Sequence, residues 1–168
     1  MEGLILKGLI LSAGFGTRLL PYTETVPKPL FRLDGKTVLE RIIEILVLAG
    51  CQRVYINTHH LGRKIEAFIK TIDNRDLVRT IHEPRILDTG GAIKNTAGFV
   101  GTDCLIVINS DVVFSLDIGK VAQYHRKEGA LATLVLHKDE RFNTVIIDKD
   151  RNIKRFKGGS DPFAFTGI

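Results

Sequence analysis

An apolar strand that runs directly into a glycine loop, and then into a proline-rich stretch, most restricts how this chain can fold. Residues 4–11 read LILKGLIL, and Gly14-Phe15-Gly16 follows closely. The next segment is interrupted by prolines at Pro21, Pro27 and Pro29. Proline breaks helix interiors and favours an extended conformation in the residue before it. The sequence therefore predicts a strand, a tight glycine loop and, over residues 18–31, an ordered and mostly extended loop.

The loop also carries residue types that bind phosphate. Glycines allow backbone N–H groups to approach phosphate oxygens closely. The guanidinium of Arg18 can bind two such oxygens as a fork, and Lys28 adds a compact positive charge. Together these residues predict a site for the linked phosphates of a nucleoside triphosphate.

Two other glycine-rich phosphate loops fit less well. A P-loop requires Gly-Lys-Ser or Gly-Lys-Thr, and neither follows these glycines. The dinucleotide fingerprint Gly-x-Gly-x-x-Gly fits at Gly14 and Gly16, and Asp34 has the spacing of its acidic residue. However, Leu19 occupies the third glycine position, and the fingerprint must open a helix that the prolines prevent. A nicotinamide-dependent oxidoreductase is therefore disfavoured.

At these residues the chain resembles the sugar-phosphate nucleotidyltransferases, whose signature is close to L-A-A-G-x-G-T-R-L-x-P-L-T followed by P-K-P-L. Residues 11–23 read LSAGFGTRLLPYT, and residues 27–30 read PKPL. The resemblance covers nearly the whole chain, because later motifs follow in the family's order. It implies that the nucleotide is held by Ala13, Gly14, Gly16 and Thr17, and that its triphosphate is bound by Arg18 and Lys28.

Strand-like and helical segments alternate over the first three quarters of the chain. Strands are expected at 53–57, 77–82 and 104–108, and helices at 37–49, 61–72, 89–97 and 115–127. Thr37 and Glu40 form a capping box, and Thr89 and Ser115 are the expected caps of the last two helices. This alternation predicts a Rossmann-like, doubly wound α/β/α fold with three layers around a mainly parallel sheet.

The pattern changes after Ala130 to strand-like segments at 130–136, 144–148 and 153–156, with a turn at 149–152. No linker or repeat is evident, so residues 1–168 are expected to form one domain. Residues 163–168 look like the start of a further strand, and members of the resembled family continue well beyond this point. The expectation is a nucleotidyltransferase domain without its C-terminal part, where the family carries a second metal-binding aspartate.

Asn109-Ser110-Asp111 directly follows the apolar segment 104–108. Ligands of open α/β sheets bind outside the carboxyl ends of the strands, where a carboxylate can hold Mg²⁺ against phosphate oxygens. A turn or helix-capping aspartate is the alternative. The resembled family has its metal-binding aspartate here in a Gly-Asp pair, which implies that Asp111 is a Mg²⁺ ligand although Ser110 replaces the glycine.

Residues 83–91, EPRILDTGG, resemble the family's base-recognition segment, which implies nucleotide binding by Glu83, Thr89 and Gly90. A Glu83 carboxylate can accept from guanine N1–H and N2–H₂ together, whereas a glutamine would suit uracil. This slightly favours GTP with mannose 1-phosphate over UTP with another sugar 1-phosphate, although uridylyltransferases can also carry glutamate here. The alternative is a surface turn built on Pro84 and the two glycines.

The resemblance also implies a sugar-phosphate side formed by Asn143, Lys157, Thr166 and Gly167. Asn143 stands where the family has glycine, and Lys157 lacks the usual Glu-Lys-Pro context; a solvated strand face is the alternative for this lysine.

The implied reaction is Mg²⁺-dependent transfer of a nucleotidyl group from a nucleoside triphosphate to a sugar 1-phosphate, with release of pyrophosphate. A phosphate monoester is largely dianionic near neutral pH, because its second pKa is about 6, so no general base is required. A non-catalytic binding or regulatory module of the same fold is the alternative, favoured by Ser110, Asn143 and the short chain.

Composition and charge limit the partners. The formal charge of +5 suits small anions, but no basic run interleaved with aromatic residues indicates nucleic-acid binding. The apolar start lacks a basic leader region and is interrupted by Lys7, and no segment is long enough to span a membrane. A cytoplasmic protein is expected, with Cys51 and Cys104 as buried free thiols. Whether it forms a homo-oligomer stays open.

Overall fold

The computed structural model describes residues 5–139, 145–156 and 163–168. The chain divides into two compact units, residues 1–124 and 125–168. Each unit is described by itself, and the single domain expected from the sequence stays a prediction.

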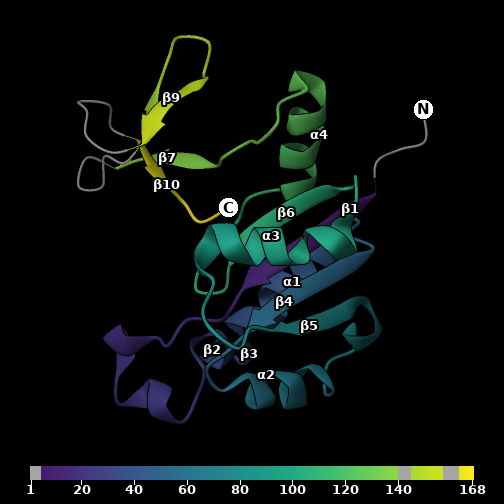
Figure 1. The fold of residues 1–168 in the computed structure, drawn as a ribbon, viewed down its shortest axis with the longest axis vertical. Helices are drawn as coiled ribbons and strands as arrows, with labels where there is room; N and C mark the ends of the chain where they lie inside the picture. The colour runs from purple at the N-terminus through teal and green to yellow at the C-terminus, as the bar shows by residue number, and fades with distance from the viewer. Residues whose placement is uncertain (1–4, 140–144, 157–162) are drawn as a thin grey trace. The chain divides into compact units, whose positions relative to one another are not determined.

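The first unit is built around a four-stranded parallel sheet (Figure 1). Its strands stand in the order β5 (Val78–His82), β4 (Arg53–Thr58), β1 (Leu6–Leu11) and β6 (Cys104–Asn109). From β1 the chain adds β4 and β5 on one side and then returns to place β6 on the other. This is the doubly wound, mainly parallel arrangement that the alternating pattern predicts.

Helices cover both faces of this sheet. They are α1 (Val38–Leu48), α2 (Gly62–Ile69) and α3 (Asp88–Val100). A Cβ at Gly8 of β1 would lie 2.8 Å from Leu46 Cδ1, so α1 packs closely on that face. The next residue, Leu9, is completely buried in a cluster with Val100 of α3. Because neighbouring strand residues point to opposite faces, α1 and α3 form the two outer layers around the sheet.

The chain between β1 and α1 is irregular, but it is not extended. It forms three single 3₁₀ turns, η1 (Thr17–Leu19), η2 (Tyr22–Glu24) and η3 (Lys28–Leu30). The expectation of a mostly extended loop is therefore wrong, while the expectation that no regular helix follows the glycines is confirmed. The prolines at the turn boundaries fix φ near the value that a 3₁₀ turn needs, which explains the difference.

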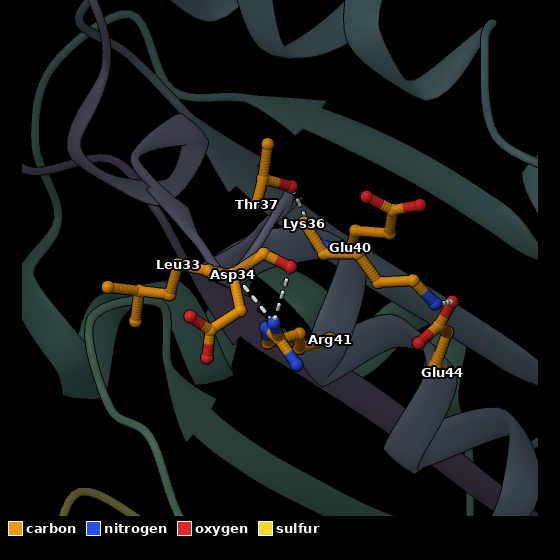
Figure 2. Close-up of polar contacts among 7 residues, drawn as sticks. All are labelled: Leu33, Asp34, Lys36, Thr37, Glu40, Arg41 and Glu44. Atoms are coloured by element: carbon orange, nitrogen blue, oxygen red, sulfur yellow. Dashed lines mark hydrogen bonds and ion pairs between the residues drawn. The ribbon is translucent and has the colours of Figure 1, made fainter.

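A two-residue hairpin closes this loop and connects it to α1 (Figure 2). Strands β2 (Arg32–Leu33) and β3 (Lys36–Thr37) pair antiparallel around Asp34 and Gly35, which both have positive φ. Aspartate followed by glycine is favoured in such tight turns, so Asp34 is a turn residue and not the acidic residue of a dinucleotide site. The Arg41 side chain of α1 donates to the carbonyl oxygens of Leu33 and Asp34. Thr37 caps α1 by accepting from the Glu40 N–H at 3.1 Å, as the capping box predicts.

Two predicted helix caps are wrong. Helix α3 begins at Asp88, with Leu87 at the cap position, so Thr89 lies in the first turn. Helix α4 (Ile118–Glu128) begins after Asp117, whose Oδ1 accepts from the Lys120 N–H at 3.1 Å, so Asp117 and not Ser115 caps its first turn. A shorter turn, η4 (Arg75–Leu77), precedes β5.

The second unit contains a four-stranded antiparallel sheet in the order β7-β10-β8-β9. The strands are β7 (Leu136–Lys138), β8 (Val145–Ile147), β9 (Ile153–Phe156) and β10 (Phe163–Phe165). The first was predicted too early, at 130–136. The predicted turn at 149–152 is confirmed, since Asp148 Oδ1 accepts from the Asp150 and Asn152 N–H groups at 2.9 and 2.8 Å.

Candidate functional site

The loops after β1 and β6 diverge at the point where the direction of strand addition reverses. Strands β1 and β6 are neighbours, and their pairing continues past the strand ends through the Ser110 N–H, which donates to the Leu11 carbonyl oxygen at 3.1 Å. In open α/β sheets this reversal opens a crevice at the carboxyl ends, where ligands bind. The glycine loop and Asp111 therefore stand on the two sides of the expected binding position.

Lys28 and Asp111 are brought into direct contact at this position. Lys28 Nζ donates to Asp111 Oδ2 as an ion pair. Their side chains are 28% and 32% exposed, so both remain accessible to a ligand. The two residues are far apart in sequence, and the motif analysis placed both in the site. The structure thus joins the proline-flanked lysine to the carboxylate after β6.

The two glycines of the loop have different surroundings. Gly16 has φ of 67°, and a Cβ there would lie 2.9 Å from Thr23 Cγ2 and 3.6 Å from Lys28 Cβ. Thr23 is buried and donates through its hydroxyl to the Gly16 carbonyl oxygen at 3.0 Å. A Cβ at Gly14 would meet nothing within 4 Å. Gly16 therefore fixes the shape of the loop beside Lys28, while Gly14 leaves its outer side open.

The remaining residues of the loop differ in exposure. Ala13 is buried, and Thr17 and Arg18 are exposed in and around η1. Arg18 has no hydrogen bond or ion pair with any residue that the structure describes. Its guanidinium is available for an incoming ligand.

The segment 83–91 lies at the end of β5 and leads into α3. Thr89 and Gly90 are exposed in the first turn of α3, and a Cβ at Gly90 would meet nothing within 4 Å. Gly91 differs, because a Cβ there would lie 2.7 Å from Leu87 Cβ. Gly90 therefore leaves one side of the backbone open, while Gly91 allows the backbone to pack against Leu87.

Glu83 does not face the crevice as the base-reading expectation requires. Its side chain is 0% exposed. Oε1 accepts from Asn57 Nδ2 at 2.9 Å, and Oε2 accepts from the Leu87 N–H at 3.1 Å. In this arrangement a nucleobase reaches neither oxygen, because both are enclosed by protein.

Asn57 and Ser12 are site residues that the sequence analysis missed. Asn57 Oδ1 accepts from the Ser12 N–H at 2.6 Å, so Asn57 connects the glycine loop to Glu83. A polar residue at the end of the apolar strand 53–57 was the available signal. Two histidines also join the loops. His59 Nδ1 contacts the Glu83 carbonyl oxygen at 2.7 Å, and His60 Nε2 contacts that of Thr23 at 3.0 Å.

None of the expected sugar-phosphate residues belongs to the first unit, which contains the crevice. Asn143 and Lys157 lie outside the described residues. Thr166 and Gly167 belong to the second unit. The Thr166 hydroxyl donates to the Val135 carbonyl oxygen at 2.8 Å, and Gly167 has φ of 92°.

Asp111, shortly after the end of β6, is the carboxylate proposed to bind a metal ion, and its side chain is accessible. Among the described residues, no group of three or more His, Cys, Asp or Glu side chains could enclose a metal. Mg²⁺ differs from most protein-bound metals, since one or two carboxylates usually hold it together with substrate phosphates and water. A half-exposed Asp111 beside a phosphate-type loop fits that mode of binding.

Sequence comparison places the chain in a known family. The profile of the nucleotidyl transferase family matches residues 7–157, so the chain belongs to the nucleotidyl transferases. Its fold and the crevice described above agree with this membership.

The chain is similar to curated members of more than one specificity. It is 33% identical over 157 residues to the mannose-1-phosphate guanylyltransferase catalytic subunit beta of Drosophila pseudoobscura pseudoobscura, which covers 89% of this chain and 42% of that protein. It is 30% identical over 147 residues to the UTP–glucose-1-phosphate uridylyltransferase of a Synechocystis strain, which covers 77% of this chain and 37% of that protein. The chain thus spans less than half the length of these relatives.

Solved structures share the fold. HddC from Yersinia pseudotuberculosis, solved in complex with GMP-PN, superposes with a TM-score of 0.74 at 29% identity, covering 96% of this chain and 73% of that one. A UDP-glucose pyrophosphorylase complexed with UDP-glucose superposes with a TM-score of 0.81 at 19% identity, covering 98% of this chain and 75% of that one. The second match supports the fold alone.

Proposed function

We propose that this chain transfers a nucleotidyl group from a nucleoside triphosphate to a sugar 1-phosphate, releasing pyrophosphate and forming a nucleotide sugar. The observation that carries the proposal is the contact between Lys28 and Asp111 at the β1/β6 crevice, beside the glycine loop. A phosphate-binding lysine paired with a single accessible carboxylate suits a polyphosphate that arrives with a divalent cation.

In the reaction, an oxygen of the sugar phosphate attacks the α-phosphorus of the triphosphate, and the bond from this phosphorus to the bridging oxygen of the β-phosphate breaks. The attacking phosphate is already largely dianionic, since its second pKa is about 6, so the protein needs no general base. Catalysis then depends on positioning and on neutralising negative charge.

The proposed roles follow the geometry. Arg18 binds the departing pyrophosphate, and Lys28 leaves Asp111 to bind the α-phosphate. Asp111 would hold Mg²⁺, which supplies charge neutralisation at the phosphates when bound. The nucleotide lies against backbone and side chains of Ala13, Gly14, Gly16, Thr17, Thr89 and Gly90.

The base and the sugar are the finer part of the proposal. The guanylyltransferase relative supports GTP with mannose 1-phosphate first, and the HddC complex with GMP-PN supports a guanine nucleotide. The uridylyltransferase relative supports UTP with glucose 1-phosphate next. We propose that Asn143, Lys157, Thr166 and Gly167 bind the sugar phosphate, and that the protein acts in the cytoplasm. No helix in the described ranges is both long enough and apolar enough to cross a bilayer.

A pyrophosphate-release assay tests the proposal. The protein is mixed with Mg²⁺, each of the four common triphosphates in turn, and a panel of sugar 1-phosphates. We expect release with one pairing, at a rate that Asp111→Ala lowers at least about a hundredfold. Asp76→Asn, at a carboxylate that is 93% exposed, is the matched control and should leave the rate unchanged.

The non-catalytic alternative gives a different outcome in the same samples. A regulatory module would raise its melting temperature with one triphosphate, because selective binding stabilises the folded state. It would release no pyrophosphate with any sugar 1-phosphate. If no triphosphate raised the melting temperature and no pyrophosphate were released, both functions would be contradicted.

A further inference from the structure

A continuous chain of hydrogen bonds, buried at Asn57 and half-buried at its last link to Leu87, crosses the carboxyl edge of three adjacent strands. It runs from the Ser12 N–H after β1 to Asn57 on β4, and from Asn57 to the Glu83 carboxylate after β5. It ends at the Leu87 N–H, directly before α3. We propose that Asn57 and Glu83 form a strut that fixes the distance between the glycine loop and the start of α3, and that Glu83 positions the nucleotide-binding segments without contacting the base. The inference rests on the function proposed above.

The orientation of the Asn57 amide is determined by its partners. Its oxygen faces a backbone N–H, which can only donate, and its NH₂ group faces a carboxylate, which can only accept. A flipped amide would oppose donor to donor and acceptor to acceptor. Only one orientation of the Asn57 amide therefore gives hydrogen bonds to both neighbours in the strut.

The burial of Glu83 supports a positioning role. A carboxylate without solvent contact is costly unless hydrogen bonds compensate for its lost hydration. Both of its oxygens have partners, and its backbone is held as well. The Glu83 N–H donates to the Thr58 carbonyl oxygen at 2.8 Å, and the Glu83 carbonyl oxygen contacts His59 at 2.7 Å. Four bonds hold one residue, and direct base contact would require this enclosed residue to move toward the surface.

The strut reaches both groups that are proposed to touch the nucleotide. At one end, Ser12 precedes the loop residues Ala13 and Gly14. At the other end, Leu87 precedes the exposed Thr89 and Gly90 of α3. A change in the length of the strut would move these two groups relative to one another. Nucleotide affinity should therefore depend on the strut even in a fully folded protein.

Exchanging the two polar groups gives a sharp test. In Asn57→Asp two carboxylates face each other, and in Glu83→Gln the new NH₂ group opposes either Asn57 or the Leu87 N–H. In the double variant N57D/E83Q every bond is restored. The new aspartate accepts from Ser12 and from the new glutamine, whose oxygen accepts from Leu87, and the net charge is that of the parent protein.

We expect each single variant to lower the melting temperature by about 3 °C or more, since each leaves a buried group unsatisfied. Affinity for Mg-GTP or Mg-UTP, measured well below every melting temperature, should fall at least about tenfold in each single variant. The double variant should recover most of both losses. N95D/E128Q, which makes the same exchange at exposed positions, should match the parent. Additive losses in N57D/E83Q would overturn the strut.

The ratio of GTP affinity to UTP affinity separates positioning from base reading. A strut predicts that the double variant keeps the parental ratio within about twofold. If Glu83 reads the base, glutamine at this position should change the ratio by about tenfold or more, as one buried hydrogen-bond pair does, and that result would overturn the proposal. A parent that binds no triphosphate would contradict the proposed function, while the melting temperatures of the four proteins would still decide the strut.

Discussion

Lys28 and Asp111 neutralise each other at the mouth of the crevice, where the loop after β1 meets the end of β6. The lysine occupies one oxygen of the carboxylate that we propose for the metal ion. In the proposed function, a phosphate would attract the lysine away and a cation would take its place at the carboxylate. The pair would then keep both charges compensated until the two ligands arrive together.

Removing this lysine should expose the carboxylate to cations. We expect Lys28→Met to tighten Mn²⁺ binding in the absence of nucleotide by about two- to fivefold, the range of a partly exposed ion pair. The same variant should bind Mg-triphosphate less tightly. Electron paramagnetic resonance of free Mn²⁺ measures the first effect. The control is Lys36→Met, which removes a lysine of the hairpin that pairs with Glu44 of α1. Mn²⁺ binding in Lys28→Met that is equal to or weaker than in the parent protein would count against the arrangement.

Arg18 should contribute through its forked geometry and not only through its charge. Arg18→Ala is expected to lower the rate of pyrophosphate release at least about a hundredfold, and Arg18→Lys should recover only part of this loss because an ammonium group lacks the planar fork. Steady-state kinetics at varied triphosphate concentration provides the measurement. Arg63→Ala, at an exposed position of α2, should have no effect. Full activity in Arg18→Lys would show that charge alone suffices.

The two loop glycines should respond differently to alanine. Gly16→Ala places a side chain at a left-handed φ and against Thr23, so the free energy of unfolding should fall by about 1–2 kcal/mol or more. Gly14→Ala meets open space and should leave stability nearly unchanged while weakening nucleotide binding. Urea denaturation and calorimetric titration measure the two effects. The opposite order of stabilities would refute the account of the loop.

Cys51 should be inert in the folded protein. Burial, with a smaller effect from nearby Cys104, raises the pKa of its thiol to about 12. Relative to an ordinary thiol with a pKa of about 8.5, the thiolate fraction at pH 8 is then lower by on the order of a thousandfold. Stopped-flow reaction with a thiol-specific disulfide reagent should show this suppression in native protein and its loss in urea. Rapid labelling of Cys51 in the native state would contradict the burial.

The same thiol gives a pH dependence whose sign is fixed. Because the folded pKa is raised, the folded state keeps its proton more tightly than the unfolded state. The contribution to stability is complete below about pH 8.5 and is lost as the pH rises toward 12. The difference in stability between the parent and Cys51→Ala should therefore shrink between pH 8 and 10 in denaturant titrations. A constant difference would mean that the thiol titrates normally.

Much of the fold could be predicted from the sequence because the signals for its elements are local. The Thr37 and Glu40 spacing gave the start of α1, and the apolar strand before the glycines gave β1. The resemblance to the family implied roles for Lys28 and Asp111 in one site, and in the structure their side chains form an ion pair.

The parts that were missed depend on tertiary neighbours. Glu83 was assigned to the base from its sequence context, yet its partners Asn57 and Leu87 are chosen by the order β5-β4-β1, which no local pattern contains. Thr89 is a residue type that often caps helices, but α3 begins at Asp88 and has Leu87 at its cap position. A Cβ at Gly91 would lie 2.7 Å from Leu87 Cβ, a contact that the local sequence does not announce.

The hairpin held by Arg41 has a consequence for binding. Its bonds to Leu33 and Asp34, together with the Phe31 carbonyl oxygen that accepts from the Val38 N–H at 3.0 Å, anchor the far end of the segment that leaves β1. A segment tethered at both ends loses its freedom when the protein folds, and an arriving ligand need not order it again. Association should therefore proceed without a slow rearrangement of this segment and with little entropic penalty from it.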